Sequence, residues 1–273
     1  MLFNRLKSLF VLIIVLLSVS ILLVLNSRTE DPKAPIVSIP KQEPIEPIVK
    51  EITRGHIIII IDDFGYRNDE VSEGFLTLDA DLTFAVIPGH KNSKLFSERA
   101  DKSGYEIIIH MPMESTADTH GELDYILTES MTSSEIEQRV EKVISEFPEA
   151  AGLNNHQGSK ATADKRIMNI VSNVLKRHGR YFVDSRTTSE TVAEDIMRSR
   201  GVPTARRHVF LDNDDDINKI RNQLYKLVDK AESKGNAIGI GHAKKLTLQV
   251  LKEEIPKLKK NGFKFQFASF VVK

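Results

Sequence analysis

Aspartate and histidine recur directly after short apolar runs of this 273-residue chain. Eight of them end such a run or follow it through a short turn: Asp62, Asp63, His90, His110, His156, Asp184, Asp212 and His242. If the runs are parallel strands, their carboxyl ends lie on one face and these side chains converge on one pocket. An aspartate after a strand is often only a helix N-cap, and a lone histidine is more often packed than ligating. Recurrence at successive strand ends favours the shared pocket.

The chain contains no cysteine, so a metal in this pocket must be bound by histidine and carboxylate. Such a ligand set suits Zn²⁺, and three protein ligands with one open position are typical of a catalytic site. The adjacent Asp62 and Asp63 can divide the work, because neighbouring side chains of a strand point in different directions. One can face a metal while the other faces substrate or water. We therefore expect one divalent metal, with Zn²⁺ as the first choice.

The elements that must hold these residues are strands and helices in alternation. Continuous apolarity is typical of parallel strands that are buried on both faces. Seven runs of the chain show it, together with a shorter run at 150–153: His56–Ile61, Leu82–Ile87, Glu106–Ile109, Tyr181–Val183, Val209–Leu211, Ala237–Ile240 and Phe265–Val272. Between them, apolar residues recur at helical spacing over 136–144, 167–175 and 217–228, the first after a Thr132-x-x-Glu135 capping box. About seven βα units without an internal break predict one β/α barrel, or a closely related open variant, over residues 55–273.

An uncharged apolar run of 17 residues, Leu9–Leu25, follows Arg5 and Lys7 near the N-terminus. It has the length of a short membrane span, and the basic residues before it predict a cytoplasmic N-terminus. The competing interpretation is a cleaved signal peptide, because Ser18-Val19-Ser20 is a small-x-small pattern, although five apolar residues follow it. We predict a single-pass anchor over residues 1–26 in the cytoplasmic (inner) membrane, with the following domain in the periplasm or otherwise outside the cytoplasm.

Residues 27–54 hold five of the ten prolines, interleaved with charges, which predicts a semi-extended tether. Lysine plus arginine and aspartate plus glutamate both total 38, so the formal net charge is zero. This balance gives no basic field and disfavours a nucleic-acid partner. Apolar residues at 41% and charged residues at 28% exclude global disorder and a polytopic membrane protein.

Six motifs together resemble the divergent polysaccharide deacetylase family, a bacterial branch of the carbohydrate esterases. In chain order they are Ile60-Ile61-Asp62-Asp63-Phe64-Gly65, His110-Met111-Pro112-Met113-Glu114, Asn154-Asn155-His156-Gln157-Gly158-Ser159, Val183-Asp184-Ser185-Arg186-Thr187, Arg207-His208-Val209-Phe210-Leu211-Asp212 and Ile240-Gly241-His242. With the units counted above, the resemblance implies a single distorted (β/α)7-type barrel with parallel strands. It also implies a metal-dependent hydrolase that removes acetyl groups from a polysaccharide or a peptidoglycan-like glycan.

The resemblance further implies roles for individual residues. Asp62 matches the family's general base and Asp63 its carboxylate metal ligand, while His110 matches the first histidine of a His-x-x-x-His ligand motif. His242 matches the final histidine motif, which would protonate the leaving group, with Asp184 holding it in position.

The chain departs from the family's pattern in two places. The position four residues after His110 holds Glu114, and Asn154-Asn155-His156 replaces the arginine-and-proline motif after the fourth strand. We expect His156 to supply the missing imidazole, with Glu114 either a direct ligand or a carboxylate that orients a histidine. The departures keep open a second function, a non-catalytic glycan-binding or scaffold protein. Hydrolysis of another ester or phosphoester is a third.

Further polar residues near the expected pocket are candidates for substrate binding. Asn154, Asn155 and Ser159 offer donors and acceptors suited to sugar hydroxyls, although asparagines after a strand also form turns. Arg186 and Arg207 would either bind an anionic substrate or form a structural ion pair with a carboxylate.

Overall fold

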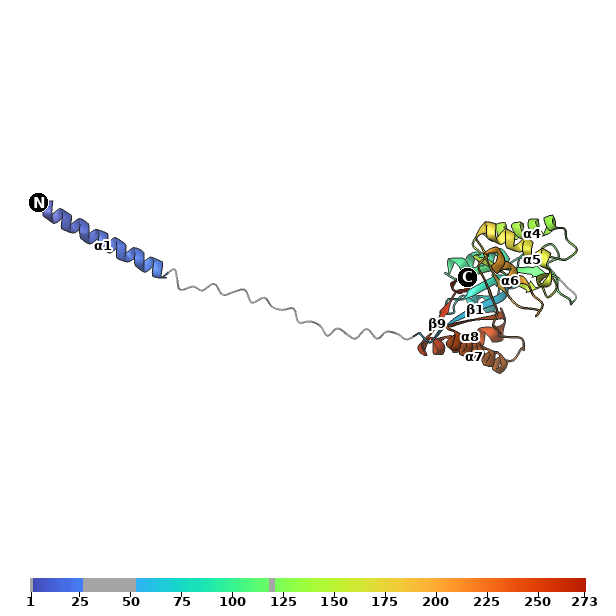
Figure 1. The fold of residues 1–273 in the computed structure, drawn as a ribbon. Coiled ribbons are helices and arrows are strands. Elements are labelled where there is room, and N and C mark those ends of the chain that lie inside the picture. Colours follow the sequence, from blue (N-terminus) through green and yellow to red (C-terminus); the bar gives the residue numbers. More distant parts are fainter. Residues whose placement is uncertain (1, 27–52, 118–120) are drawn as a thin grey trace. The chain divides into compact units, whose positions relative to one another are not determined.

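The computed structural model describes residues 2–26, 53–117 and 121–273, without the side chains of residues 2–10 and 12. The chain divides into two units, residues 1–49 and 50–273. In the first unit the described residues form helix α1 (Leu2–Asn26) (Figure 1). The predicted tether, 27–54, lies outside the described residues except for its last two positions.

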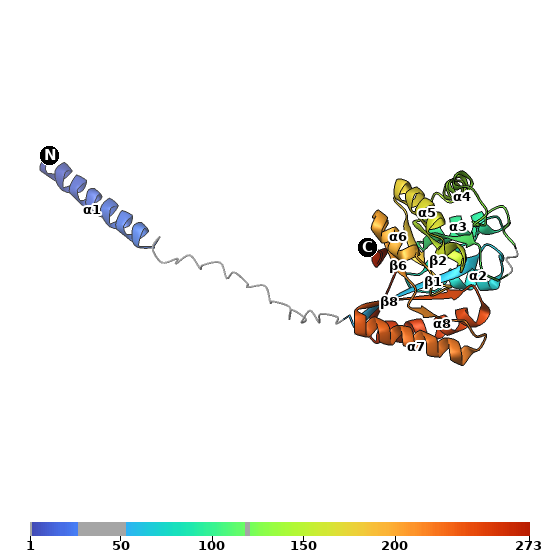
Figure 2. The same cartoon turned by 45° about the vertical axis from the view of Figure 1, so that its right-hand side comes forward.

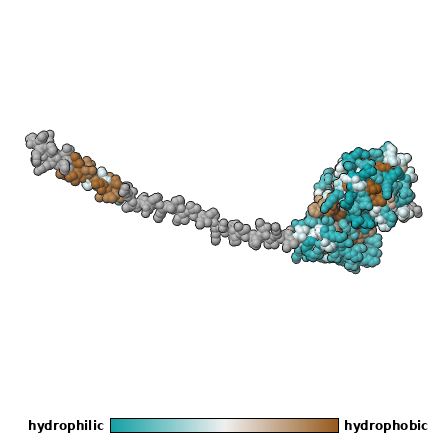
Figure 3. Space-filling view, in the orientation of Figure 1, coloured by the Kyte–Doolittle hydropathy of each residue, from teal (hydrophilic) through white to brown (hydrophobic). Residues whose placement is uncertain are grey.

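Helix α1 presents apolar side chains along its described length (Figure 3). Each large apolar side chain described between Val11 and Leu25 is at least 46% exposed. Over the part of the chain that the structure describes, no helix has the length and apolarity that crossing a membrane requires.

The second unit is built around one curled sheet of nine parallel strands (Figure 1). They are β1 (Gly55–Phe64), β2 (Thr83–Val86), β3 (Glu106–Met113), β4 (Gly152–Gln157), β5 (Tyr181–Asp184), β6 (Thr204–Arg206), β7 (Val209–Phe210), β8 (Asn236–His242) and β9 (Phe263–Gln266). The strand order is β6-β5-β4-β3-β2-β1-β8-β7, and β9 pairs with β1. The predicted distorted barrel of parallel strands is confirmed. The eight apolar runs each overlap one of these strands, and β6 was not predicted, so the expectation of about seven βα units is too low.

One chain segment joins the two edges of this sheet. Strands β6 and β7 are separated only by Arg207 and His208. The Arg207 amide donates to Asp184 O of β5, and the next amide, that of His208, donates to Ile238 O of β8. The segment therefore changes partner in the middle, and the described residues form no β6–β7 ladder. Its shortness explains why hydrophobic pattern alone identified only the part from Val209 onward.

Strand β1 also changes partner along one edge. Its first half pairs with β9, ending at Ile58↔Gln266, and its second half pairs with β2, starting at Ile60↔Thr83. Strand β9 therefore has no neighbour on this edge after Gln266, and the chain turns into the short 3₁₀ helix η2 (Ala268–Phe270). The Ala268 amide donates to Thr83 Oγ1 at this turn. The expectation of a strand over Phe265–Val272 is wrong for this reason.

Seven α-helices of the second unit pack around the outside of the sheet (Figure 2). They are α2 (Glu70–Phe75), α3 (Ser93–Lys102), α4 (Ser133–Glu146), α5 (Lys165–His178), α6 (Ala193–Arg200), α7 (Ile217–Lys234) and α8 (Lys245–Lys260), with a 3₁₀ turn, η1 (Ala161–Ala163), before α5. The three helices expected from apolar spacing are confirmed as α4, α5 and α7. The capping box at the start of α4 is confirmed too, because Thr132 Oγ1 accepts from the Glu135 amide and the Glu135 carboxylate accepts from the Thr132 amide.

Alternation along the strands separates two apolar layers. In β1, Ile57, Ile59 and Ile61 pack between sheet and helices, while Ile58 and Ile60 fill the inside of the barrel. Ile108 of β3 and Ile238 and Ile240 of β8 share the inner layer. The continuous apolar runs thus serve both faces, as parallel buried strands require.

Phe64, the last residue of β1, anchors the strand in the outer layer. Its ring stacks on Phe96 at a centroid distance of 3.9 Å and also contacts Phe75 and Phe84. We expect Phe64→Ala to lower the free energy of unfolding by about 3–5 kcal/mol, because a fully buried ring is replaced by a cavity. Phe270, half exposed, is the control: Phe270→Ala should cost less than half as much. Equal losses for both in urea denaturation would contradict this assignment of the core.

Candidate functional site

The candidate site lies where the inward-facing positions of the strands reach their carboxyl ends. The inner apolar series of β1 continues from Ile58 and Ile60 to Asp62, and that of β8 from Ile238 and Ile240 to His242, opposite Asp62 in register. On β3, Ile108 is followed on the same face by His110, which pairs in register with Asn154 of β4. Strand alternation thus directs these polar groups into one mouth of the barrel.

A bulge in β1 brings Asp63 to the same mouth. Between Ile61↔Phe84 and Phe64↔Val86, β1 has one more residue than β2. Asp63 takes the left-handed conformation, with φ 70°, which a residue with a Cβ adopts at a cost of about 1–2 kcal/mol. Regular alternation would turn Asp63 toward the helices. The sequence predicts that the two adjacent carboxylates point in different directions. The bulge instead lets both of them reach the site.

Three electron-pair donors meet at the centre of this site. Asp63 Oδ1 lies 3.4 Å from His110 Nε2 and 3.3 Å from His156 Nδ1, and the two ring nitrogens are 3.0 Å apart. Asp63 Oδ1 is buried and has no hydrogen-bond partner among the described residues. This Asp/His/His set is the group of described residues placed to hold a metal ion. It contains the three ligands that the sequence predicts.

The ring of His110 is oriented by a chain of hydrogen bonds behind it. Asn154 Nδ2 donates to Asp62 Oδ1 at 2.8 Å, so Asn154 Oδ1 faces His110 Nδ1 at 2.7 Å as an acceptor. We therefore assign the proton of neutral His110 to Nδ1, which leaves the Nε2 lone pair directed at the cluster. Asn154 holds Asp62 and His110 together, which corrects its expected role in binding a sugar hydroxyl.

Charge and burial act against each other in the cluster. Burial alone would raise the pKa of Asp63, but the imidazoles of His110 and His156 hold it below its ordinary value. Burial lowers the pKa of His110, but Asp62 and Asp63 together raise it to about 9. A metal ion must displace the proton that this pKa places on His110 near neutral pH. Metal binding should therefore release a proton and weaken as the pH falls.

His242 is paired with Asp212. Its Nδ1 lies 2.8 Å from Asp212 Oδ1, and the other carboxylate oxygen accepts from the His242 amide and from Thr247 Oγ1. Burial acts to lower the pKa of His242, but the bond and charge of Asp212 raise it above its ordinary value. The Nε2 atom points to the cluster and lies 4.0 Å from Asp63 Oδ2.

Asp184 does not hold His242, so that prediction is wrong. Val183 occupies the inward position of β5, and the next residue, Asp184, faces the opposite way. Its carboxylate accepts from the Arg186 amide and from Thr191 Oγ1. The sequence does contain a signal for the partner of His242, since Asp212 is among the carboxylates that follow strands. The choice between Asp184 and Asp212 depends on the register of the strands.

The structure does not bring three other predicted residues into the cluster. Glu114 follows the end of β3, and its carboxylate binds Lys160 Nζ and the Glu129 amide, each at 2.7 Å. Ser159 Oγ accepts from the Thr116 amide. Asn155 lines the adjoining cavity, but its side chain binds the Ser185 amide and Gln157 O, which makes it a loop-positioning residue.

A cavity of about 410 Å³ opens directly beside the cluster. Asp62, His110, His156 and His242 line one part of it, and most of the remaining lining, called the second wall, comes from the ends of β4 and β7 and the segments that follow β5, β6 and β7. That second wall contains both predicted arginines and several residues that sequence reasoning did not assign: Gln157, Ser185, Arg186, Thr187, Arg207, Phe210 and Asn213. Two of the unassigned residues, Gln157 and Ser185, each carry a side-chain oxygen that has no hydrogen-bond partner among the described residues.

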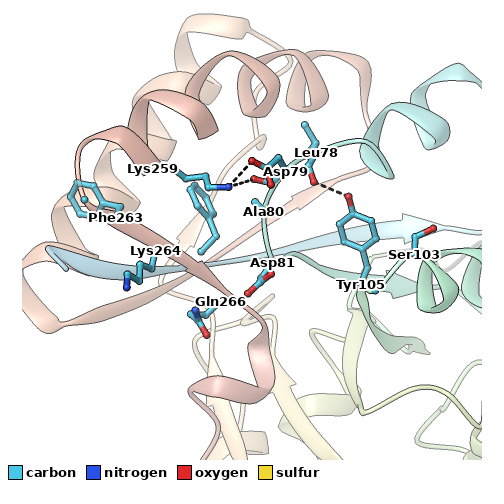
Figure 4. Close-up of a pocket in the computed structure, with 13 residues that line it drawn as sticks. Leu78, Asp79, Ala80, Asp81, Ser103, Tyr105, Lys259, Phe263, Lys264 and Gln266 are labelled. Atoms are coloured by element: carbon cyan, nitrogen blue, oxygen red, sulfur yellow. Dashed lines mark hydrogen bonds and ion pairs between the residues drawn. The ribbon is translucent and has the colours of Figure 1, made fainter. Parts of the chain in front are cut away.

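A somewhat larger cavity, of about 490 Å³, lies at the other end of the strands (Figure 4). It sits where β9 and β2 separate along β1, and a Lys259–Asp79 ion pair and the Tyr105 hydroxyl on Leu78 O occupy its wall. None of the clustered metal-binding groups borders it. The amino-terminal face of a β/α barrel generally serves stability, so we place the chemistry at the smaller cavity.

The fold and the cluster define a distorted β/α-barrel protein with a candidate metal site at the carboxyl ends of its strands. The chain belongs to the divergent polysaccharide deacetylase family, whose model matches residues 59–272. This membership confirms the resemblance that the six motifs carry.

Relatives share both sequence and fold with this chain. It is 34% identical over 204 residues to the uncharacterized protein YibQ of Escherichia coli K12, an alignment that covers 75% of this chain and 63% of YibQ. It is 33% identical over 195 residues to an uncharacterized protein of Haemophilus influenzae, covering 71% and 69% of the two chains. The crystal structure of the uncharacterized protein ATU2773 from Agrobacterium tumefaciens C58 has a TM-score of 0.76 at 18% identity, covering 81% of this chain and 90% of that one. The chain thus spans less than two thirds of YibQ.

The geometry of the cluster makes a direct prediction about metal binding. Purified protein titrated with Zn²⁺ should bind about one equivalent, because three ligand atoms already converge. The His110→Ala, His156→Ala double variant should lose this binding, since one carboxylate remains. Glu114→Gln is the matched control and should keep it. Stoichiometric zinc in the double variant, measured by elemental analysis, would refute the ligand assignment.

Proposed function

We propose that this protein is a zinc-dependent hydrolase that removes acetyl groups from an envelope polysaccharide or a peptidoglycan-like glycan. The observation that carries the proposal is the convergence of Asp63, His110 and His156 beside the buried Asp62. Family membership supplies the reaction class, since the fold is that of the polysaccharide deacetylases. The adjoining cavity has room for a sugar residue and is lined by neutral and basic hydrogen-bonding groups.

Asp62 is suited to act as the general base. A metal held by Asp63, His110 and His156 would supply a Lewis acid for the acetyl carbonyl and lower the pKa of water. Asn154 binds Asp62 Oδ1 and fixes the carboxylate, which leaves Oδ2 to accept the proton of the attacking water. Burial raises the pKa of Asp62, and a carboxylate with a raised pKa is a stronger base.

His242 is suited to act as the general acid. With Nδ1 bonded to Asp212, its Nε2–H faces the cluster and can pass a proton to the departing sugar nitrogen or oxygen. The bond from that atom to the acetyl carbon breaks as the proton arrives, so the sugar leaves as a neutral amine or alcohol. Asp212 favours the protonated imidazole that this step requires.

The two proton-transfer roles can be tested without disturbing the metal ligands. We expect Asp62→Asn and His242→Ala to lower turnover on an acetylated glycan by about 10²–10⁴, because each removes a general acid or base. Bound metal and glycan affinity should be retained. Acetate release from a panel of N- and O-acetylated glycans measures turnover. Zinc analysis measures the bound metal, and calorimetry measures the glycan affinity. If the metal-loaded wild type releases no acetate, or both variants match it, the non-catalytic glycan-binding function replaces the hydrolase.

A matched pair of aspartates tests how His242 is held. Asp212→Asn should lower turnover strongly, because it removes the charge that keeps the His242 ring protonated and oriented. Asp184→Asn, an equally conservative change at a buried strand end on the opposite face, should leave turnover of the folded protein near wild type.

We also propose that the N-terminal segment anchors the protein in the cytoplasmic membrane, with the barrel on the outer side. The support is the apolar sequence Leu9–Leu25 behind Arg5 and Lys7, and the exposure of the described apolar side chains of α1.

The anchor and a cleaved signal peptide predict different mature proteins. With an anchor, the purified protein keeps residues 1–26 and sediments with membranes until detergent is added. A variant truncated before residue 27 is the control and should stay in the soluble fraction. A mature N-terminus at Ile21, found by N-terminal sequencing, would show cleavage instead.

A further inference from the structure

The second wall of the site cavity contains an arginine that is held in place without a counter-ion. Arg207 Nε donates to Ser185 O at 2.6 Å, and its Nη2 donates to Arg186 O at 2.8 Å. The guanidinium also lies over the ring of Phe210, 4.8 Å from its centroid. Two carbonyls and an aromatic face therefore fix the plane of the group, while Nη1 makes no hydrogen bond to the described residues.

No described carboxylate neutralises this cation at ion-pair distance. Asp62 and Asp184 act on it only from further away, and each carboxylate is bonded elsewhere, Asp62 to Asn154 and Asp184 to Thr191. Burial is the largest influence on the pKa of Arg207 and lowers it. The structural ion pair that the sequence left open for Arg207 is therefore not formed.

Arginines elsewhere on the barrel show the usual arrangement. Arg99 binds Glu73, Arg177 binds two glutamates of α4, and Arg221 binds two of α8. The pairs of Arg99 and Arg177 lie at the surface, where water would solvate the charge anyway, and the more enclosed Arg221 has carboxylates to neutralise it. Arg207 is more enclosed and faces a cavity, and a partly desolvated charge without an anion costs free energy that a bound anion recovers.

Further unpaired polar groups face the same cavity. Ser185, which is 6% exposed, and Gln157 each carry a buried side-chain oxygen with no hydrogen-bond partner among the described residues. Both residues line the cavity with Arg186, whose guanidinium likewise has no carboxylate within ion-pair distance among the described residues. The wall thus offers positive charge and unused hydrogen-bonding groups in one place.

We infer that the glycan bound in this cavity carries an anionic group next to the acetylated sugar, and that Arg207, assisted by Arg186, binds that group. The inference rests on the proposed function and narrows its substrate class to acidic glycans. A carboxylate or a phosphate matches the guanidinium fork, and both would lie beside Ser185 and Gln157. Phe210 links the two parts of the site, because its ring contacts both Arg207 and the His242 imidazole.

The test compares acidic glycans with a neutral counterpart. The first probe is a glycan strand of N-acetylated sugars, of which every second sugar carries a free lactyl carboxylate. The second is the same strand after its carboxylates are converted to methylamides, and the third is an N-acetylglucosamine oligomer phosphorylated at its primary hydroxyls. Calorimetry on the zinc-loaded full chain should show at least tenfold tighter binding of one acidic probe than of the methylamide. The preferred acidic probe identifies the anion.

Variants tie that preference to the arginines. Arg207→Gln should remove most of the tenfold preference, and Arg186→Gln should reduce it, because the affinity for the acidic strand falls more than the affinity for the methylamide strand. Arg206→Gln is the matched control, because this exposed neighbour pairs with Glu194 outside the cavity. It should keep the full preference.

The outcomes separate the inference from the function. Equal wild-type affinity for acidic and neutral strands, or no binding of any probe, overturns the inference. So does a preference that survives in Arg207→Gln and Arg186→Gln alike. If Arg207→Gln does not fold, the wild-type comparison and Arg186→Gln still decide. Acetate release is recorded separately, so a protein that prefers acidic strands without hydrolysing them would refute the proposed function and keep the inference.

Discussion

The site depends on one irregularity in the central strand, the bulge at Asp62 and Asp63. In a regular strand Asp62 would face the barrel mouth and Asp63 the helices. The left-handed Asp63 adds one residue against β2, so Asp63 joins the cluster and Phe64 takes the outward position among three aromatic rings. The left-handed conformation costs about 1–2 kcal/mol, and the stabilisation from burying the Phe64 ring is comparable or larger. The same residue insertion thus sets both the placement of Asp62 and Asp63 at the mouth and the packing that stabilises it.

Two of the three histidines at the mouth, His110 and His242, are held in the same way. One ring nitrogen is fixed from behind and the other faces the centre: Asn154 binds His110 and Asp212 binds His242. The difference lies in the charge of the supporting group. The amide of Asn154 turns His110 Nε2 toward Asp63 and His156, whereas the carboxylate of Asp212 favours a protonated His242. Supporting groups of different charge therefore suit two similar imidazoles to different chemistry.

The sequence predicts the parallel barrel, the family and the three clustered ligands, because apolar runs and the residues that end them are local features. It fails where the outcome depends on which face a strand end presents. Asp184 and Asp212 look equivalent in sequence, and only the inward position of Val183 shows that Asp184 points away. The bridging role of Asn154 likewise requires the register of β3 with β4. Strand β6 is missed because it has only three residues, in a segment that pairs first with β5 and then with β8, and three residues show no hydrophobic periodicity.

The departure from the family's motif after His110 is compensated within the sheet. Pro112 of β3 is in register with His156 of β4, so an inward residue on the neighbouring strand reaches the space next to His110. A strand holds an imidazole more firmly than a loop does, and at His156 the pairing with β3 fixes the backbone of β4. Residue 114 is then free of the metal site, and Glu114 binds Lys160 and the Glu129 amide instead. The bond to Lys160 joins the loop after β3 to the loop after β4, so Glu114 supports the end of the strand that carries His156, the residue proposed to supply the missing imidazole.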